Sequence, residues 1–168
     1  MARIQGLDQS AQDSEPQAGE GALWVAMYFD HHCLWLAQQE LCSLESVLDV
    51  QRQDRVAPAV GVINWAGQDW PVFCLGGADL AVMIDLPASR RVCLLLDNGQ
   101  QRIAMVCDRI EMLAQSSRQY DPLPPCMDRS GALVAGLIVH DETVNCLTTA
   151  ARLASFCQRA TLQGAKHG

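Results

Sequence analysis

Residues 61–75 read GVINWAGQDWPVFCL, and this stretch decides what the rest of the chain is expected to be. Two short apolar runs, 61–65 and 70–75, flank the turn residues Ala66-Gly67-Gln68-Asp69. Gly67 can take the positive φ that a tight reversal requires. Short runs rich in Val and Ile with a turn between them are typical of a β-hairpin, so the stretch predicts two antiparallel strands joined near Gly67.

The same pattern recurs along the chain. Three further pairs of apolar runs predict hairpins: 23–29 with 33–36, 91–96 with 102–107, and 133–139 with 143–147. The turn between the second pair contains Asn98-Gly99, the strongest short hairpin signal in the chain. Four hairpins in one domain favour an all-β architecture of paired barrels or a sandwich.

Two segments depart from the β pattern. In 36–47, apolar residues recur every three to four positions among Gln and Glu, which predicts a short helix running into a strand. Near the end of the chain, Thr148 or Thr149 can cap a helix that Gly164 ends. The apolar face of this helix is expected to consist of Leu153, Phe156, Cys157 and Ala160.

The other segments set the domain bounds. Residues 1–21 are acidic and have almost no bulky apolar side chains, so they are expected to form a disordered tail. One domain is expected over 22–160, followed by a flexible C-terminus over 161–168. Prolines between 115 and 132 predict a long connecting loop without regular structure.

Composition and charge limit the kinds of partner. The 168 residues are 49% apolar and carry a formal net charge of −7, which opposes binding to nucleic acid and to anionic lipid. The longest apolar run, 131–139, is about half of the ~20 residues that a membrane-spanning helix needs. No secretory signal is visible at the start of the chain. These features predict a cytoplasmic protein with no direct membrane insertion.

The cysteines are expected to be reduced. The chain has eight, spaced nine or more residues apart, with no CxxC pair: Cys33, Cys42, Cys74, Cys93, Cys107, Cys126, Cys146 and Cys157. Most lie in apolar runs, where Cys behaves as a small core residue. This usage favours free thiols in a cytoplasmic protein over a disulfide framework.

Catalytic motifs are missing from the sequence. It contains no phosphate-binding loop, no dinucleotide fingerprint, no HExxH and no GxSxG, so neither an enzyme nor a cofactor is expected. The alternative is a thiol- or metal-dependent sensor or enzyme that uses His31-His32-Cys33, since imidazole and thiolate suit zinc or copper. Neighbouring residues of a strand point to opposite faces, which favours an ordinary hairpin tip and no metal site.

Two tryptophans flank the turn of the first hairpin. Trp65 and Trp70 form either an exposed aromatic pair that anchors a protein interface or two core residues of neighbouring strands. The sequence leaves both interpretations open.

These residues lead to a resemblance. Residues 61–75 resemble the hallmark of the CheW-like domain family, which reads roughly G-V-I-N-L-R-G-x-x-V-P-V-x-D-L. Residues 103–113 resemble a later family motif, G-L-x-V-D-x-V-x-x-V, and 134–153 fit the strand pair and helix that end the family domain. The resemblance covers about residues 23–157.

The resemblance implies a fold and a role. The fold is all-β with minor α, made of two intertwined five-stranded SH3-like barrels plus a C-terminal helix. The role is that of a non-catalytic chemotaxis adaptor, which couples the cytoplasmic tip of a methyl-accepting chemoreceptor to the regulatory domain of a CheA-type histidine kinase. It implies a protein that is monomeric alone and joins a larger array. A scaffold that holds only one of these partners is a variant of the same hypothesis.

The partner-binding residues are expected on the segments that match the family. They are Leu41, Leu44, Gly61, Val62, Ile63, Asn64, Trp65, Gly67, Trp70, Val106 and Asp108. The arginine of the family hallmark is Ala66 here, and its aspartate is Cys74. Alanine cannot replace the planar donors of arginine, so the contacts are expected to differ. By analogy these departures point to a divergent or auxiliary adaptor of a type IV pilus system for twitching motility.

Overall fold

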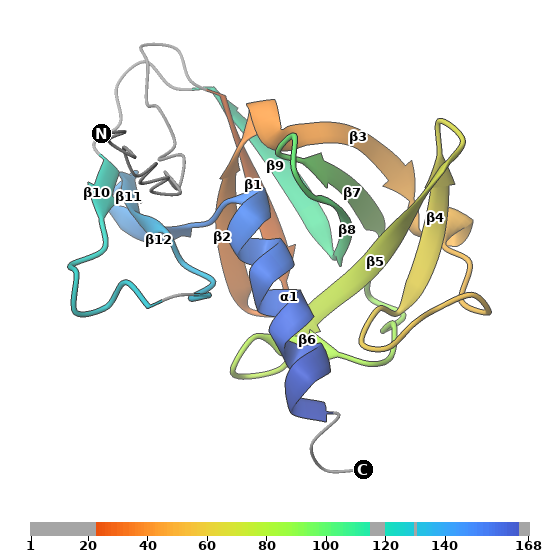
Figure 1. Ribbon diagram of the computed structural model, residues 1–168. Helices are drawn as coiled ribbons and strands as arrows, with labels where there is room; N and C mark the ends of the chain where they lie inside the picture. Colours follow the sequence, from red (N-terminus) through yellow and green to blue (C-terminus); the bar gives the residue numbers. More distant parts are fainter. Residues whose placement is uncertain (1–22, 115–119, 130, 165–168) are drawn as a thin grey trace, which may run out of the picture.

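The computed structural model describes residues 23–114, 120–129 and 131–164, so the tail expected over 1–21 lies outside the described residues (Figure 1). In chain order the elements are β1 (Leu23–Phe29), β2 (His32–Ala37), the 3₁₀ turn η1 (Gln38–Glu40), β3 (Leu41–Ser46), the 3₁₀ turn η2 (Val47–Asp49), β4 (Gly61–Trp65), β5 (Gln68–Gly76), β6 (Ala81–Met83), β7 (Val92–Asp97), β8 (Arg102–Cys107), β9 (Arg109–Ala114), β10 (Tyr120–Pro122), β11 (Gly136–His140), β12 (Thr143–Leu147) and α1 (Ala150–Gly164).

The strands form two sheets. Sheet A has the order β10-β11-β12-β2-β1-β9, and sheet B has the order β3-β7-β8-β5-β4 with β6 beside β5. Each sheet contains five strands of the expected barrel and one added strand of three residues, β10 in sheet A and β6 in sheet B. The fold is therefore the one that the resemblance implied, two curled sheets and one C-terminal helix.

The chain passes between the sheets at two places. Sheet B is built from consecutive strands, β3 to β8, whereas sheet A takes β1 and β2 from before this segment and β9 to β12 from after it. Asp108 alone separates β8 from β9, so the second crossing is a single residue. Two parallel pairs, β12 with β2 and β5 with β8, complete the sheets.

All four predicted hairpins are present. They are β1–β2, β4–β5, β7–β8 and β11–β12, each paired antiparallel. In β4–β5 the pair Trp65 and Gln68 closes a turn of only two residues, Ala66 and Gly67, whose φ angles are 51° and 75°. Positive φ at both central positions is what a type I′ turn requires, and its twist matches that of the flanking strands.

The C-terminal helix also forms as predicted. Thr149 Oγ1 accepts a hydrogen bond from the backbone N–H of Arg152 at 3.2 Å, which caps the first turn. Leu153 and Cys157 are buried on the face that packs against the sheets. The helix continues to Gly164, past the domain end expected at residue 160, and residues 165–168 lie outside the described residues.

The segment 36–47, predicted as a short helix running into a strand, contains the strand, but its helical part is reduced to a single 3₁₀ turn. These residues form the end of β2, η1, β3 and the start of η2. Side chains of β3 alternate between half-buried and exposed, with Leu41 half-buried and Leu44 exposed. A spacing of three residues fits a helix but also fits a strand whose register shifts, and β3 has such a shift against β7 between Leu41 and Ser43. Pairing with β7 outweighs the local helical pattern.

The loop predicted over 115–132 needs a smaller correction. Residues 120–122 form the short strand β10, which pairs with β11 at the edge of sheet A. Pro122 ends this strand, a position that an edge strand allows because one side of its backbone has no partner strand. Residues 115–119 and 130 lie outside the described residues.

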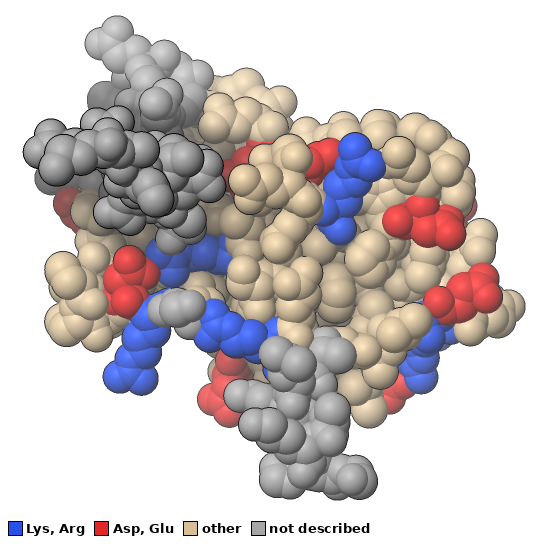
Figure 2. Space-filling view, viewed as in Figure 1, with Lys and Arg blue, Asp and Glu red and all other residues tan. Residues whose placement is uncertain are grey.

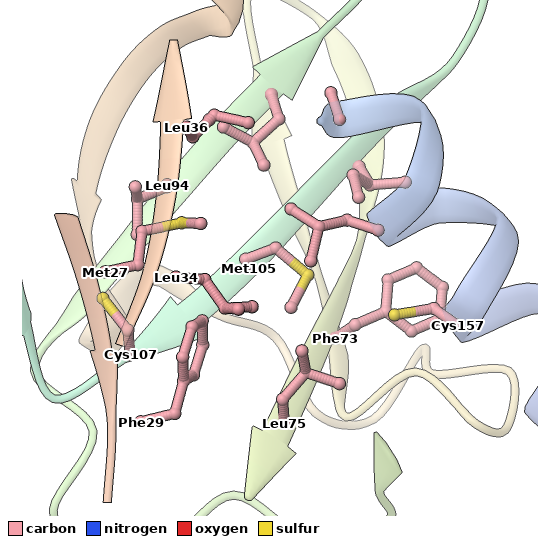
Figure 3. Close-up of a cluster of buried hydrophobic side chains, with 14 of the residues drawn as sticks. Met27, Phe29, Leu34, Leu36, Phe73, Leu75, Leu94, Met105, Cys107 and Cys157 are labelled. Carbon is pink, nitrogen blue, oxygen red and sulfur yellow. The ribbon is translucent and has the colours of Figure 1, made fainter. Parts of the chain in front are cut away.

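Three apolar clusters hold the molecule together. The central cluster lies between the two sheets and under α1, and Figure 3 shows Met27, Phe29, Met105 and Cys157 converging there from both sheets and the helix. A second cluster around Trp70 belongs to sheet B, and a third around Trp24 belongs to sheet A. Each fully buried large apolar side chain stabilises the fold by about 1.5–3 kcal/mol.

The cysteines are unpaired, and half of them are core residues. Cys74, Cys93, Cys107 and Cys157 are buried, Cys33 and Cys146 are half-buried, and Cys42 and Cys126 are exposed. Burial raises the pKa of the Cys93, Cys107 and Cys157 thiols to about 12, so these groups stay protonated and inert at neutral pH.

Candidate functional site

The residues expected to bind partners gather on one sheet. Leu41 and Leu44 lie on β3, residues 61–70 form most of the β4–β5 hairpin, and Val106 lies on β8, all in sheet B. Asp108 lies at the crossing into sheet A. Because β3 and β4 are the two ends of the strand order in sheet B, the predicted residues of these two strands lie at its edges, whereas Trp70 on β5 and Val106 on β8 lie inside it.

Only some of these residues reach the surface. Asn64, Gly67 and Leu44 are exposed. Leu41, Val62, Trp65 and Asp108 are half-buried, whereas Gly61, Ile63, Trp70 and Val106 are buried. The accessible members therefore lie at the tip of the β4–β5 hairpin and along β3, and the buried members support them from below.

The two tryptophans take different positions. Trp70 is 2% exposed and belongs to the core of sheet B, so the core interpretation applies to it. Trp65 is half-buried and meets the Trp70 ring edge-on, with centroids 5.8 Å apart and an interplanar angle of 89°. Such a pair adds about 0.5–1.5 kcal/mol beyond its buried area. Trp65 thus packs against a buried neighbour and remains partly exposed.

Polar contacts fix the tip of the same hairpin. Asn64 Nδ2 donates to Asp69 Oδ1 at 2.8 Å across the turn. Arg102 bonds to Gln68 and also to Asp97, with 3.1 Å between Nε and Oδ2, and its guanidinium lies 5.9 Å from the Trp70 ring centroid. A hairpin tip stabilised in this way loses little conformational entropy when a partner binds.

Exposed leucines extend the surface along β3. Leu44 is 44% exposed, and Leu48 in η2 is 90% exposed. Leu48 is not among the residues that the sequence predicts to bind partners. Leu44 and Leu48 thus expose apolar area on and just after an edge strand, the kind of area that protein interfaces cover.

Two residues predicted to bind partners, Val106 and Asp108, are engaged within the fold. Val106 is fully buried in the core of sheet B. Asp108 accepts a hydrogen bond from the backbone N–H of Asp30 and is ion-paired with Arg90, with 2.6 Å between Asp108 Oδ1 and Arg90 Nη1. The side chain of Asp108 is therefore engaged within the chain.

Sequence reasoning missed the most buried charge of the described residues, Arg90. Its side chain is 0% exposed. Nη1 donates to Asp108 Oδ1 at 2.6 Å and to Asp30 Oδ1 at 3.2 Å, Nη2 donates to the Leu75 carbonyl at 2.6 Å and to Asp30 Oδ2 at 3.3 Å, and Nε points at Cys74 Sγ at 3.4 Å. Nothing in the sequence distinguishes Arg90 from its exposed neighbour Arg91.

This network shifts the pKa of its members. The hydrogen bond from Arg90 lowers the pKa of Asp30. Burial acts to raise the pKa of Asp108, but the bonds from Arg90 and from the backbone of Asp30 outweigh it, and the pKa is lowered. Burial likewise acts to lower the pKa of Arg90, and its bonds to Cys74 and the two carboxyl groups raise it instead. All three groups are charged at neutral pH.

The alternative site at His31-His32-Cys33 does not assemble. His31 is exposed in the β1–β2 turn, whereas Nε2 of His32 lies 3.2 Å from the Gly77 carbonyl oxygen and 3.0 Å from that of Ala78. Burial raises the pKa of the Cys33 thiol, the opposite of what a reactive thiolate needs. In residues 23–114, 120–129 and 131–164, no group of three or more His, Cys, Asp or Glu is placed to hold a metal ion.

Charge and hydropathy add two observations. Among the described residues of the face drawn in Figure 2, basic and acidic side chains are interspersed in small groups without a continuous basic patch. The described part of the chain contains no helix long and apolar enough to cross a membrane.

Comparison with known proteins places the fold. No protein-family model and no curated protein matches the sequence. Among solved structures, the chain is similar to the scaffolding protein TtCheW from Thermoanaerobacter tengcongensis, with 17% sequence identity and a TM-score of 0.57. The match covers 76% of this chain and 88% of that one. The chain therefore has a CheW-like fold.

Proposed function

We propose that this protein is a non-catalytic signalling adaptor that couples the cytoplasmic tip of a chemoreceptor to the regulatory domain of a CheA-type histidine kinase. The observation that carries the proposal is the fold, since two curled sheets of this kind also form a scaffolding protein. The accessible edges of sheet B support it, because an adaptor acts through surfaces and not through a reaction centre.

The proposed docking surface consists of the accessible predicted residues and Leu48. These are Leu41, Leu44, Leu48, Asn64, Trp65 and Gly67. Trp65 is its anchor, because a large ring held by a buried neighbour offers apolar area at low entropic cost. The buried residues Ile63, Trp70 and Val106 support this surface without touching a partner.

The setting of the adaptor belongs to the same proposal. We place it in the cytoplasm, as a monomer that joins a larger receptor array, without a nucleic-acid or lipid partner. Ala66 and Cys74 depart from the family hallmark, and on that ground we assign it to the auxiliary adaptors of a type IV pilus chemosensory system.

A binding experiment tests the proposal. The full chain is immobilised and offered the cytoplasmic receptor tip and the kinase regulatory domain separately. Both are expected to be retained, and Trp65→Ala is expected to weaken retention of at least one of them by ten-fold or more, since an anchoring Trp contributes about 2–4 kcal/mol. Val144→Ala is the matched control, because Val144 is 61% exposed on sheet A and outside the proposed surface. Retention of neither partner by the unmodified chain would refute the adaptor role.

A further inference from the structure

The Arg90 network lies where the two sheets meet. Asp30 is in the turn between β1 and β2 of sheet A, and Leu75 is in β5 of sheet B. Arg90 precedes β7 of sheet B, and Asp108 is the single residue between β8 of sheet B and β9 of sheet A. One guanidinium therefore contacts both sheets and the crossing between them.

The geometry uses the whole guanidinium. Arginine has five N–H donors in a rigid plane, and the five contacts of Arg90 to Cys74, Asp30, Asp108 and the Leu75 carbonyl use Nε, Nη1 and Nη2. Because the side chain is 0% exposed, water does not replace a lost acceptor easily. The orientation of each contacted group is therefore tied to the plane of one side chain.

Further hydrogen bonds and close packing connect the two turns next to Arg90. Asp108 Oδ2 accepts from the backbone N–H of Asp30 at 2.7 Å, and Asp30 Oδ2 accepts from that of Gly77 at 3.1 Å. Gly76 has no room for a side chain, because a Cβ there would collide with Met83, Arg90 and Asp30. The turn after β5 is thus packed directly against the turn after β1.

The apolar core between the sheets constrains their arrangement in a different way from the Arg90 network. Hydrophobic contact is non-directional, so the central cluster resists separation of the sheets more than it resists a change of angle between them. Charge-assisted hydrogen bonds are directional and short. We infer that Arg90, Asp30 and Asp108 form a joint that fixes the angle between sheet A and sheet B, so that the two sheets move as one body.

The consequence for signalling rests on the proposed function. The proposed docking surface lies on sheet B, so a rigid joint would carry the position of a partner bound there to whatever sheet A contacts. The joint itself is a property of the free chain and is tested without partners.

The test measures the distance between the sheets. One spin label is attached to the native, exposed Cys42 on β3 of sheet B, and the other to Val144→Cys on β12 of sheet A. The other accessible or half-buried thiols, Cys33, Cys126 and Cys146, are replaced by Ala. Pulsed electron paramagnetic resonance on the full chain is expected to give one narrow distance distribution.

Three variants probe the joint. Asp108→Asn, Asp30→Asn and Arg90→Lys are each expected to broaden the distribution at least two-fold or to shift its maximum. Asp97→Asn is the matched control, because it removes an ion pair to Arg102 of similar length, 3.1 Å between Nε and Oδ2, that lies within sheet B alone. The control is expected to keep the distribution of the unmodified chain.

The outcomes separate the joint from other roles. An unchanged distribution in a folded Asp108→Asn variant, with circular dichroism as the check of folding, would overturn the inference. If Asp108→Asn does not fold, Asp30→Asn decides, since the Asp30 side chain is 35% exposed. Failure of Asp30→Asn to fold would also overturn the inference, because the network would then be required for folding itself and not specifically for the angle between the two sheets. If the unmodified chain binds neither partner but the three variants broaden the distance distribution, only the proposed function is refuted and the joint stands.

Discussion

Trp65 and Trp70 are in contact, yet their burial gives them different roles. Trp70 fills the core of sheet B, whereas Trp65 covers its edge and remains partly accessible. Trp70→Ala is expected to lower the free energy of unfolding by about 3–5 kcal/mol, the usual cost of emptying a large aromatic site. Trp65→Ala is expected to cost clearly less. Urea denaturation followed by circular dichroism compares them, and equal losses would contradict the assignment of Trp65 to the surface.

The thiols offer a second prediction at this scale. Under native conditions a thiol reagent is expected to modify Cys42 and Cys126 first, because both are exposed, and to leave Cys93, Cys107 and Cys157 unmodified. Burial raises the pKa of these last three to about 12, which removes the reactive thiolate. Mass spectrometry of the labelled peptides gives the order. Fastest reaction at Cys33 would instead revive a thiol-based function.

At the residue scale the sequence predicts strands better than it predicts contacts. Residues 61–65 of the hallmark form the edge strand β4, but burial decides which of the predicted residues are accessible, and burial depends on strands far along the chain. Arg90 is the clearest case, since its partners Asp30 and Asp108 lie 60 and 18 positions away. No local pattern signals that three charges will meet inside a protein.

At the scale of elements, local signals were sufficient where a turn and two apolar runs coincide. The four hairpins are of this kind, and the cap predicted at Thr148 or Thr149 marks the start of α1, where Thr149 makes the capping bond.

 The segment 36–47 misled because its spacing suits a helix, while β3 makes its backbone hydrogen bonds with β7, a strand far along the chain. Pairing between strands so far apart along the chain leaves no local signal in the sequence.

Glu40 gives a prediction for the helix element. Burial raises its pKa above the ordinary 4.5, although the backbone N–H of Ala150 at the start of α1 partly opposes the shift. A carboxyl group whose pKa is raised by folding stabilises the fold below its ordinary pKa, and this contribution is lost as the pH rises through the raised value. Glu40→Gln is therefore expected to gain stability relative to the unmodified chain as the pH rises above the ordinary pKa of 4.5 toward neutrality.

Urea denaturation of both proteins across this range measures the difference. Glu45→Gln on β3 is the control, because the Glu45 carboxylate accepts a hydrogen bond from Ser43 within its own strand. A difference that stays constant with pH would show that Glu40 is not held in the buried form.

For the whole molecule, the shared central core implies one cooperative unit. Trp24 and Trp35 lie in the cluster of sheet A, and Trp65 and Trp70 lie in that of sheet B. In a variant with Trp24 and Trp35 replaced by Phe, the remaining tryptophans report the unfolding of sheet B. In a second variant with Trp65 and Trp70 replaced by Phe, the remaining tryptophans report the unfolding of sheet A. Both unfolding transitions are expected to coincide with that seen by circular dichroism. Two separate midpoints would show that the sheets unfold independently.

The nested order of the strands has a consequence for synthesis of the protein. All strands of sheet B have been made once the ribosome has passed residue 107, whereas β1 and β2 still lack β9 and β12, their neighbours in sheet A. The middle of the chain can complete its hydrogen bonds first, while the earliest hairpin waits for the latest strands. The strands that are synthesised first, β1 and β2, are thus among the last to complete their sheet.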